Sequence, residues 1–311
     1  MNESKMITEG ALLTVLYSIL LVIALYLPVV GMVVFLILPV PFIIFASRYN
    51  WKPSLLMGLV AILLSIFIAA GATMPMTVLV AVGGIVTGCA IYKGLKPYET
   101  WAAGTIGFAI GLVFVYAFVQ VVLKIDIMAM FDEAVDESLN LVESMDIMNQ
   151  INDDMYQMFT EQVMILKDLI PAGIVVMSIL YAFVGLWLSY KIINRIEGKQ
   201  KGFPPFRKFD LPTSVIWIYF LALIFTFFDI DQQSFLYIGV VNIIMLATIL
   251  LTIQGFSLIF CFSHVKKWPK AIPIISIFLG LLLPVLFYII RILGIIDLGF
   301  SVKHRLSGDK K

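Results

Sequence analysis

Charged side chains are scarce in this 311-residue chain, where Asp, Glu, Lys and Arg make up 13% of the residues. Soluble globular proteins carry about 25% charged residues. The scarcity, with 61% hydrophobic residues and a mean hydropathy of +1.04, therefore excludes a soluble globular protein. The formal net charge of +1 points to no nucleic-acid partner and no acidic substrate. We expect a membrane protein whose surroundings are the lipid bilayer.

Cysteine and histidine are nearly absent. The two cysteines, Cys89 and Cys261, lie in apolar runs without a CxxC pair, which predicts buried thiols and no redox or metal site. The two histidines, His264 and His304, stand beside lysines in basic segments. That setting is typical of interfacial anchors and not of catalytic residues.

Enzyme motifs are missing as well. The chain has no GxxxxGK phosphate loop, no GxGxxG after a strand and no HExxH. No pair of carboxylates or histidines lies inside the apolar segments to activate water, so an intramembrane enzyme is the least favoured interpretation. We expect no enzyme, no cofactor and no bound metal. A signal peptide is not expected either, because the first apolar run leads into another without a small-residue cleavage site.

Long apolar runs dominate the chain instead. A hydrocarbon core of about 30 Å needs about 20 residues of helix. Nine segments fit this length: residues 10–27, 29–47, 54–72, 74–92, 101–123, 169–193, 212–228, 235–262 and 271–296. The predicted fold class is therefore an all-α polytopic membrane protein with about nine transmembrane helices. The first two segments share one uncharged run, which Pro28 and Gly31 should fold into a hairpin. Pro39 and Pro41 leave a re-entrant second segment as the alternative.

A basic loop at residues 191–211 divides these segments. It contains Lys191, Arg195, Lys199, Lys201, Arg207 and Lys208. Short loops rich in Lys and Arg resist translocation, so we expect this loop in the cytoplasm. The predicted organisation is a six-helix membrane module at 1–195, the cytoplasmic loop at 196–211, and a three-span module with a basic tail at 212–311.

The other loops alternate in charge when they are counted from a cytoplasmic N-terminus. The inner side receives Lys5, Arg48, Lys52, Lys93, Lys96, Lys266, Lys267 and Lys270. Acidic residues collect on the outer side, mainly in the linker 124–168. Apolar residues recur there at helical spacing, for example Leu141, Met145 and Met148, then Met155, Met158 and Phe159. The pattern predicts one or two amphipathic helices on the outer surface, with a cation-collecting or partner-binding cap as the alternative.

The C-terminal tail conflicts with this alternation. Nine crossings place Lys303 and Arg305 outside, although basic residues favour the cytoplasm. Pro284 should kink or break the last helix. We nevertheless expect that segment to cross once, because about 26 residues of helix reach about 39 Å. A broken helix that returns the tail to the inside is the alternative.

Small residues on one face of the first span form a candidate contact surface. Gly10, Thr14 and Ser18 recur at helical spacing. Such a ridge serves either close packing inside the bundle or docking of a separate membrane subunit. Similar spacing in Gly84 and Gly88, and in Gly104, Gly107 and Gly111, predicts internal packing.

The few polar residues inside the spans are the other candidates: Gln120, Asn242, Gln254, Arg291 and Asp297. An ionisable residue at membrane depth is a functional candidate by default. Because Arg291 and Asp297 lie towards a span end, snorkelling or a mutual ion pair also accounts for them. Asn242 and Gln254 also fit hydrogen bonds between neighbouring helices.

Three segments, together with the six-helix block, resemble a known family. They are GFPPFRKFDLP at 202–212, QGFS at 254–257 and LGIIDLGFSVKHR at 293–305. The chain resembles the YybS family of bacterial multi-pass membrane proteins of unknown function. That family is in turn similar to the S components of energy-coupling factor transporters and to the rod-shape protein MreD.

The resemblance implies a bacterial plasma-membrane location and a substrate-binding or transporter-associated role, with the ligand unknown. In S components an AxxxA-type ridge on the first helix meets the coupling subunit, and Gly10, Thr14 and Ser18 are the matching positions here. None of the three is alanine, and three further spans follow the six. The alternative implied by the MreD resemblance is a structural or scaffold protein without a small-molecule substrate.

Overall fold

A computed structural model of the protein describes residues 3–69, 71–144, 165–198, 200–228, 230–231 and 234–307. The predicted helical positions from Met145 to Phe159 lie outside the described residues. The chain divides into two compact units. Unit 1 comprises Met1–Thr160 and Gly173–Phe203, and unit 2 comprises Glu161–Ala172 and Pro204–Lys311.

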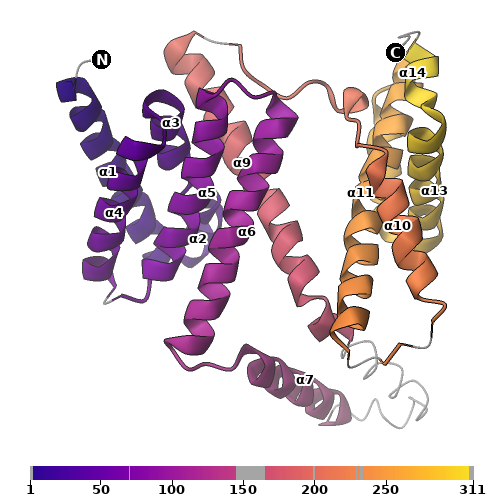
Figure 1. The fold of residues 1–311 in the computed structure, drawn as a ribbon, viewed down its shortest axis with the longest axis horizontal. Coiled ribbons are helices and arrows are strands. Elements are labelled where there is room, and N and C mark those ends of the chain that lie inside the picture. The colour runs from indigo at the N-terminus through magenta and orange to yellow at the C-terminus, as the bar shows by residue number, and fades with distance from the viewer. Residues whose placement is uncertain are drawn as a thin grey trace. The chain divides into compact units, whose positions relative to one another are not determined.

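Every regular element in the described part of the chain is helical (Figure 1). The segments up to residue 197 are α1 (Glu3–Tyr26), α2 (Pro28–Phe35), α3 (Val40–Tyr49), α4 (Trp51–Ile68), α5 (Met74–Tyr92), α6 (Pro97–Val121), α7 (Ile127–Ser144) and α9 (Ile170–Glu197). The later ones are the short 3-10 turn η2 (Phe206–Lys208), α10 (Ser214–Phe225), α11 (Phe235–Val265), α12 (Ala271–Leu282), α13 (Pro284–Phe300) and α14 (Val302–Ser307).

The prediction of an all-α polytopic membrane protein is confirmed. Among the described residues, 7 helices are long and apolar enough to cross a membrane, or up to 8 if the bent pair α12 and α13 is one span. The shorter apolar helix α10 accounts for the remaining predicted segment. In the acidic linker, α7 starts at a side-chain cap in which the Met128 amide donates to Asp126 Oδ1 over 2.9 Å.

The first apolar run folds as the predicted hairpin. α1 ends at Tyr26, and Pro28 begins α2 at a position where its missing amide hydrogen leaves no helical bond unmade. Gly31 lies against the Ala24 carbonyl, and a Cβ atom at this position would overlap it. Glycine therefore permits the close approach of the two arms. α2 and α3 together form one apolar segment long enough to span.

Helix α3 is deeply enclosed in unit 1, since every residue of Val40–Ala46 is buried. Gly84 and Gly88 of α5 let α3 approach, because added Cβ atoms would overlap Phe42 and Ala46. The glycines of α6 let α5 approach, because added Cβ atoms would overlap Leu79, Val86 and Thr87 of α5. The predicted internal packing of both glycine series is confirmed.

An ion network joins three helix ends of unit 1. Arg48 Nη1 lies 3.0 Å from Glu9 Oε2, and Arg48 Nε lies 2.7 Å from Glu197 Oε1. The network thereby brings the start of α1, the end of α3 and the end of α9 to one side of unit 1. This arrangement is the one required by the predicted alternation of loops.

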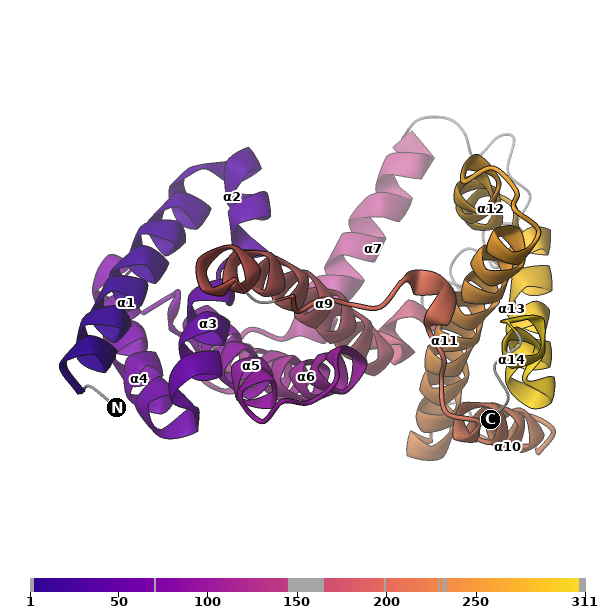
Figure 2. The same cartoon turned by 90° about the horizontal axis from the view of Figure 1, so that it is seen from above.

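Unit 2 is built on close contact between α11 and α13, which run side by side (Figures 1 and 2). Gly255 of α11 lies against the Ile290 carbonyl, and Gly294 of α13 lies against the Leu251 carbonyl. A Cβ atom at either glycine would overlap the facing backbone. Two backbones meet at this crossing with no side chain between them.

The last apolar segment is not the straight helix expected for residues 271–296. It breaks at Leu283 and Pro284, as the proline predicted, and the two parts are bent by 117°. The contacts of α13 with α11 advance in the same direction along both helices, from Arg291 with Thr248 to Asp297 with Gln254. The two helices are therefore parallel.

The course of α13 settles where the tail lies within unit 2. Lys303 of α14 contacts Phe209 and Asp210 of the basic loop. The tail thus returns to the end of unit 2 at which α11 finishes. The single outward crossing predicted from helix length is therefore wrong, and the broken helix is the arrangement in the structure. In a broken, re-entrant arrangement neither α12 nor α13 has to cross the bilayer by itself, so their short lengths are compatible with it.

Candidate ligand-binding site

Asp297 is a buried carboxylate on α13, with its side chain 1% exposed. Its Oδ2 atom accepts a hydrogen bond from Gln254 Nε2 over 2.7 Å and lies 3.3 Å from Lys303 Nζ. Its Oδ1 atom accepts from the Lys303 amide over 2.8 Å. Ser301, in the left-handed conformation at φ 52°, makes the turn that brings Lys303 back. A buried charge is tolerated only when an opposite charge or hydrogen-bond donors compensate it. Here Lys303 supplies both a cation and an amide donor.

Gln254 extends this cluster to the basic loop. The side chain is fully buried on α11. Its Nε2 group donates to Asp210 Oδ1 over 3.0 Å as well as to Asp297, and its Oε1 atom accepts from the Leu211 amide over 3.1 Å. One amide side chain therefore fastens α11 to α13 and to the loop. Both of its polar groups are satisfied, as burial requires.

Lys303 and Ser257 complete the attachment. Lys303 Nζ donates to the Phe209 carbonyl and to Ser257 Oγ, and it lies 3.7 Å from Asp210 Oδ1. Ser257 Oγ is also 2.9 Å from the Phe206 carbonyl and 3.0 Å from the Phe209 carbonyl. The loop segment 206–211 is therefore held on α11 by side chains that point out of the helix at consecutive turns.

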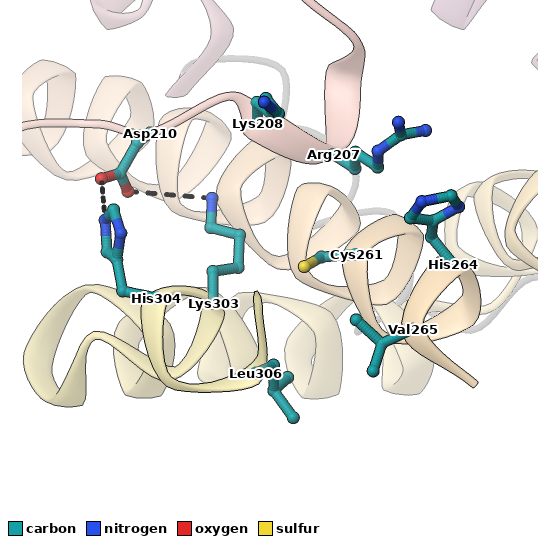
Figure 3. Close-up of a pocket in the computed structure, with 9 residues that line it drawn as sticks. All are labelled: Arg207, Lys208, Asp210, Cys261, His264, Val265, Lys303, His304 and Leu306. Carbon is teal, nitrogen blue, oxygen red and sulfur yellow. Dashed lines mark hydrogen bonds and ion pairs between the residues drawn. The ribbon is translucent and has the colours of Figure 1, made fainter. Parts of the chain in front are cut away.

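A pocket of about 670 Å³ lies beside this cluster (Figure 3). It is lined by Arg207, Lys208, Asp210, Cys261, His264, Val265, Lys303, His304 and Leu306. His304 Nε2 lies 3.1 Å from Asp210 Oδ2, so Asp210 stands between His304 and Lys303. Arg207 and Lys208 form no salt bridge with any residue that the structure describes. We call this space the cation-lined pocket.

A second pocket of about 460 Å³ shares Arg207 and His264 with the first. Its other lining residues are Pro205, Phe206, Phe260, Ser263, Lys267, Trp268, Lys270, Pro273 and Ile274. Among the described residues that line the two pockets, Asp210 is the one carboxylate. Within the described ranges, His, Cys, Asp and Glu side chains do not gather in threes that could hold a metal ion.

The other polar residues predicted inside the spans lie away from this site. Asn242 donates to the Asp168 carbonyl over 2.6 Å and accepts from the Ala172 amide over 2.7 Å, which binds the start of α9 to α11. Arg291 lies over the Tyr288 ring, 4.7 Å from its centroid. A mutual ion pair of Arg291 with Asp297 is not formed. Gln120 donates to Tyr116 Oη of its own helix.

The small-residue ridge of α1 is partly enclosed within unit 1. Thr14 is buried and donates to the Gly10 carbonyl over 2.8 Å, and Ser18 donates to the Thr14 carbonyl over 3.0 Å. A Cβ atom at Gly10 would lie 3.2 Å from the Phe45 ring. An apolar groove of about 350 Å³ between α1 and α4 also borders Gly10 and Thr14. Docking of another subunit at this ridge stays a prediction.

Sequence reasoning missed Asp210, Ser257 and Lys303 as members of one site. It treated Lys303 as a tail charge that reports topology and gave no role to Asp210 or Ser257. The available signal was that the segments 202–212, 254–257 and 293–305 carried the family resemblance together. They meet in space only because α13 turns back, which helix length alone argued against.

The fold and its buried charged cluster define a polytopic integral membrane protein with a polar pocket at one end of a helical unit. The chain matches the family model described as "Predicted membrane protein (DUF2232)" over residues 15–298, and it belongs to this family.

It is 27% identical over 315 residues to the uncharacterized protein YybS of Bacillus subtilis (strain 168), an alignment that covers 99% of this chain and 100% of YybS. No solved structure matches it. The resemblance to YybS is confirmed, whereas the more distant likeness to S components and to MreD stays a prediction.

Proposed function

We propose that this protein is a substrate-binding or transporter-associated membrane component whose small-molecule ligand occupies the cation-lined pocket. The supporting observation is the pocket itself, which gathers polar and charged side chains in a chain with 13% charged residues. Its volume of about 670 Å³ is within the range of about 300 to 1,000 Å³ typical of small-molecule sites.

The proposed orientation places the N-terminus and the cation-lined pocket on the cytoplasmic side of a bacterial plasma membrane. The support is the positive-inside rule, applied to a tail that returns beside the basic loop. With the tail at this end of unit 2, Lys303 and Arg305 join Arg207, Lys208 and Lys266. The conflict between the tail and the other loops then disappears.

The proposal includes no catalytic step. Asp297 and Lys303 are paired with each other, and both hold backbone groups in place. Side chains that are paired in this way stabilise the structure. They are poorly placed for proton transfer, which needs a base within reach of a substrate proton. We accordingly place ligand binding, and not turnover, at this site.

A structural or scaffold role is the second candidate. Its support is in unit 1, where Tyr17, Phe42 and Phe108 are fully buried in one apolar core. A bundle filled by large side chains offers partners a rigid surface and needs no small molecule.

Mass spectrometry of the protein purified in detergent separates the two candidates. We expect a small molecule to be retained by the wild type and by Ile292→Trp, a variant at an exposed position of α13. Leu306→Trp, which enlarges a lining residue of the cation-lined pocket, should lose that molecule. Co-purifying proteins with no retained small molecule would support the scaffold and reject the proposed binding function.

A further inference from the structure

Basic side chains of the two adjoining pockets form one continuous feature of unit 2. We call it the basic furrow and define it by Arg207, Lys208, His264, Lys267, Lys270, Lys303 and His304. Asp210 is the one carboxylate among the described residues that line it. Leaving the two histidines out of the count, five Lys and Arg side chains stand against this one lining carboxylate, and Asp297 offsets only the charge of Lys303. An anion is the ligand that this imbalance favours.

The loop presents its cations in a fixed position. Arg207 and Lys208 belong to the single turn η2, and the carbonyls on either side of them, from Phe206 and Phe209, lie 2.9 and 3.0 Å from Ser257 Oγ. The Phe206 ring also packs edge-on against Phe260, with centroids 5.3 Å apart. Little conformational freedom of the backbone is therefore left to lose when a ligand binds.

The side chains beside these cations suit an amphiphilic molecule. Trp268, Val265 and Ile274 line the two pockets and are themselves substantially exposed. Trp and Lys together are typical of the membrane interface, where phosphate headgroups lie. Basic pockets between membrane helices on the cytoplasmic side bind anionic headgroups in this way.

Asp210 occupies the position that an anion would take. One carboxylate oxygen lies 3.1 Å from His304 Nε2 and the other lies 3.7 Å from Lys303 Nζ (Figure 3). The side chain is 42% exposed, so it stands at the opening and not behind the cluster. An arriving oxyanion would compete with this carboxylate for the same donors.

We infer that the basic furrow binds a phosphate-bearing anion and that Asp210 is its internal competitor. The inference rests on the proposed function and names its ligand class. Arg207 and Lys208 supply charge-assisted hydrogen bonds to the phosphate oxygens, with Arg suited to two at once. The phosphate belongs either to an anionic lipid headgroup or to a soluble molecule, and both sources share this chemistry.

Binding to the protein in detergent micelles tests the inference with three probes: dioleoylphosphatidylglycerol, dioleoylphosphatidylcholine and inorganic pyrophosphate. We expect Arg207→Gln/Lys208→Gln to weaken binding of the preferred anionic probe by at least about tenfold. Lys266→Gln/Arg305→Gln removes the same two charges outside both pockets and should bind as the wild type does. Asp210→Asn keeps an oxygen for Gln254 but removes the competing charge, and it should bind about fivefold more tightly.

The probes separate the two phosphate sources. A preference for phosphatidylglycerol over phosphatidylcholine, unaffected by pyrophosphate, assigns a lipid headgroup. Tight binding of pyrophosphate without that preference assigns a soluble phosphate. The inference is overturned if neither anion binds the wild type, or if both double variants lose binding equally. Unchanged elution and thermal stability of each variant without a probe shows that a loss is not unfolding.

The double variant Arg207→Gln/Lys208→Gln also separates this inference from the proposed function. If the small molecule retained on purification is lost from Leu306→Trp but not from Arg207→Gln/Lys208→Gln, the pocket binds a ligand that is not an anion. The phosphate assignment then fails while the binding function stands. Absence of any retained molecule and of any anion binding rejects both.

Discussion

Gln254 of α11 and Asp297 of α13 are joined by a buried hydrogen bond of 2.7 Å across 43 residues of sequence. The bond lies one residue from Gly255, where the two helices meet backbone to backbone. It also links the basic loop to the returning tail, since Gln254 contacts Asp210 and Asp297 contacts Lys303. The stability of this end of unit 2 and the shape of its pocket therefore depend on the same few side chains.

Removing the carboxylate alone should be more harmful than removing the whole ion pair. Asp297→Ala removes the carboxylate that lies 3.3 Å from the buried Lys303 ammonium, and we expect a loss of about 3 kcal/mol in stability. Asp297→Ala/Lys303→Met removes both charges and should recover part of that loss. Thermal unfolding in detergent, run as a double-mutant cycle, measures the coupling. A double variant less stable than the sum of the single changes would contradict the ion-pair account.

The crossing of α11 and α13 should tolerate no added methyl group. Gly294→Ala places a Cβ atom against the Leu251 carbonyl, and separating the backbones should cost about 1 to 3 kcal/mol. Gly299→Ala on the same helix meets nothing within 4 Å and should be neutral or slightly stabilising. Comparison of the two melting temperatures checks the prediction. Equal effects at both positions would mean that the helices are not in backbone contact.

The sequence predicted the helical segments well because their cause is local. About 20 apolar residues between polar loops suffice to identify a span, and Pro28 and Pro284 mark breaks through their own missing amide hydrogens. The glycine spacings of α5 and α6 also predicted contact faces, since helical periodicity fixes which residues share a face.

The site was not predictable in the same way because its members are distant in sequence. Lys303 becomes a partner of Asp297 only after the left-handed turn at Ser301, and Asp210 joins them only because α13 runs back along α11. The length of the segment 271–296 had instead favoured a single outward crossing. The polar residues Gln254 and Asp297 were identified as candidates, but nothing local paired them with each other.

The two long loops should lie on opposite sides of the membrane. The segment 191–211 is basic and the linker 124–168 is acidic, so we expect the first in the cytoplasm and the second outside. After Cys89 and Cys261 are replaced, an impermeant thiol reagent applied to intact cells should label Ser144→Cys and spare Gln200→Cys. Labelling in permeabilised cells shows that both thiols are reactive. The reverse pattern in intact cells would overturn the proposed orientation.

Enlarging the α1 ridge should lower stability if its role is internal packing. Thr14 is 5% exposed, so Thr14→Leu forces a longer side chain into an enclosed position and should lower the melting temperature by several degrees. Ile19→Leu, at an exposed position of the same helix, is the control. A Thr14→Leu protein that melts like the wild type but loses a co-purifying membrane subunit would instead support docking.

The central claim is that the basic loop and the returning tail form one site on one side of the membrane, and cross-linking tests it most directly. Asp210 and His304 are in side-chain contact at 3.1 Å. In a protein without Cys89 and Cys261, Asp210→Cys/His304→Cys should be joined in high yield by a short bifunctional thiol reagent. Asp210→Cys/Ser234→Cys, with the second thiol at the opposite end of α11, should not be joined. Two reactive thiols at 210 and 304 that fail to cross-link would contradict the claim.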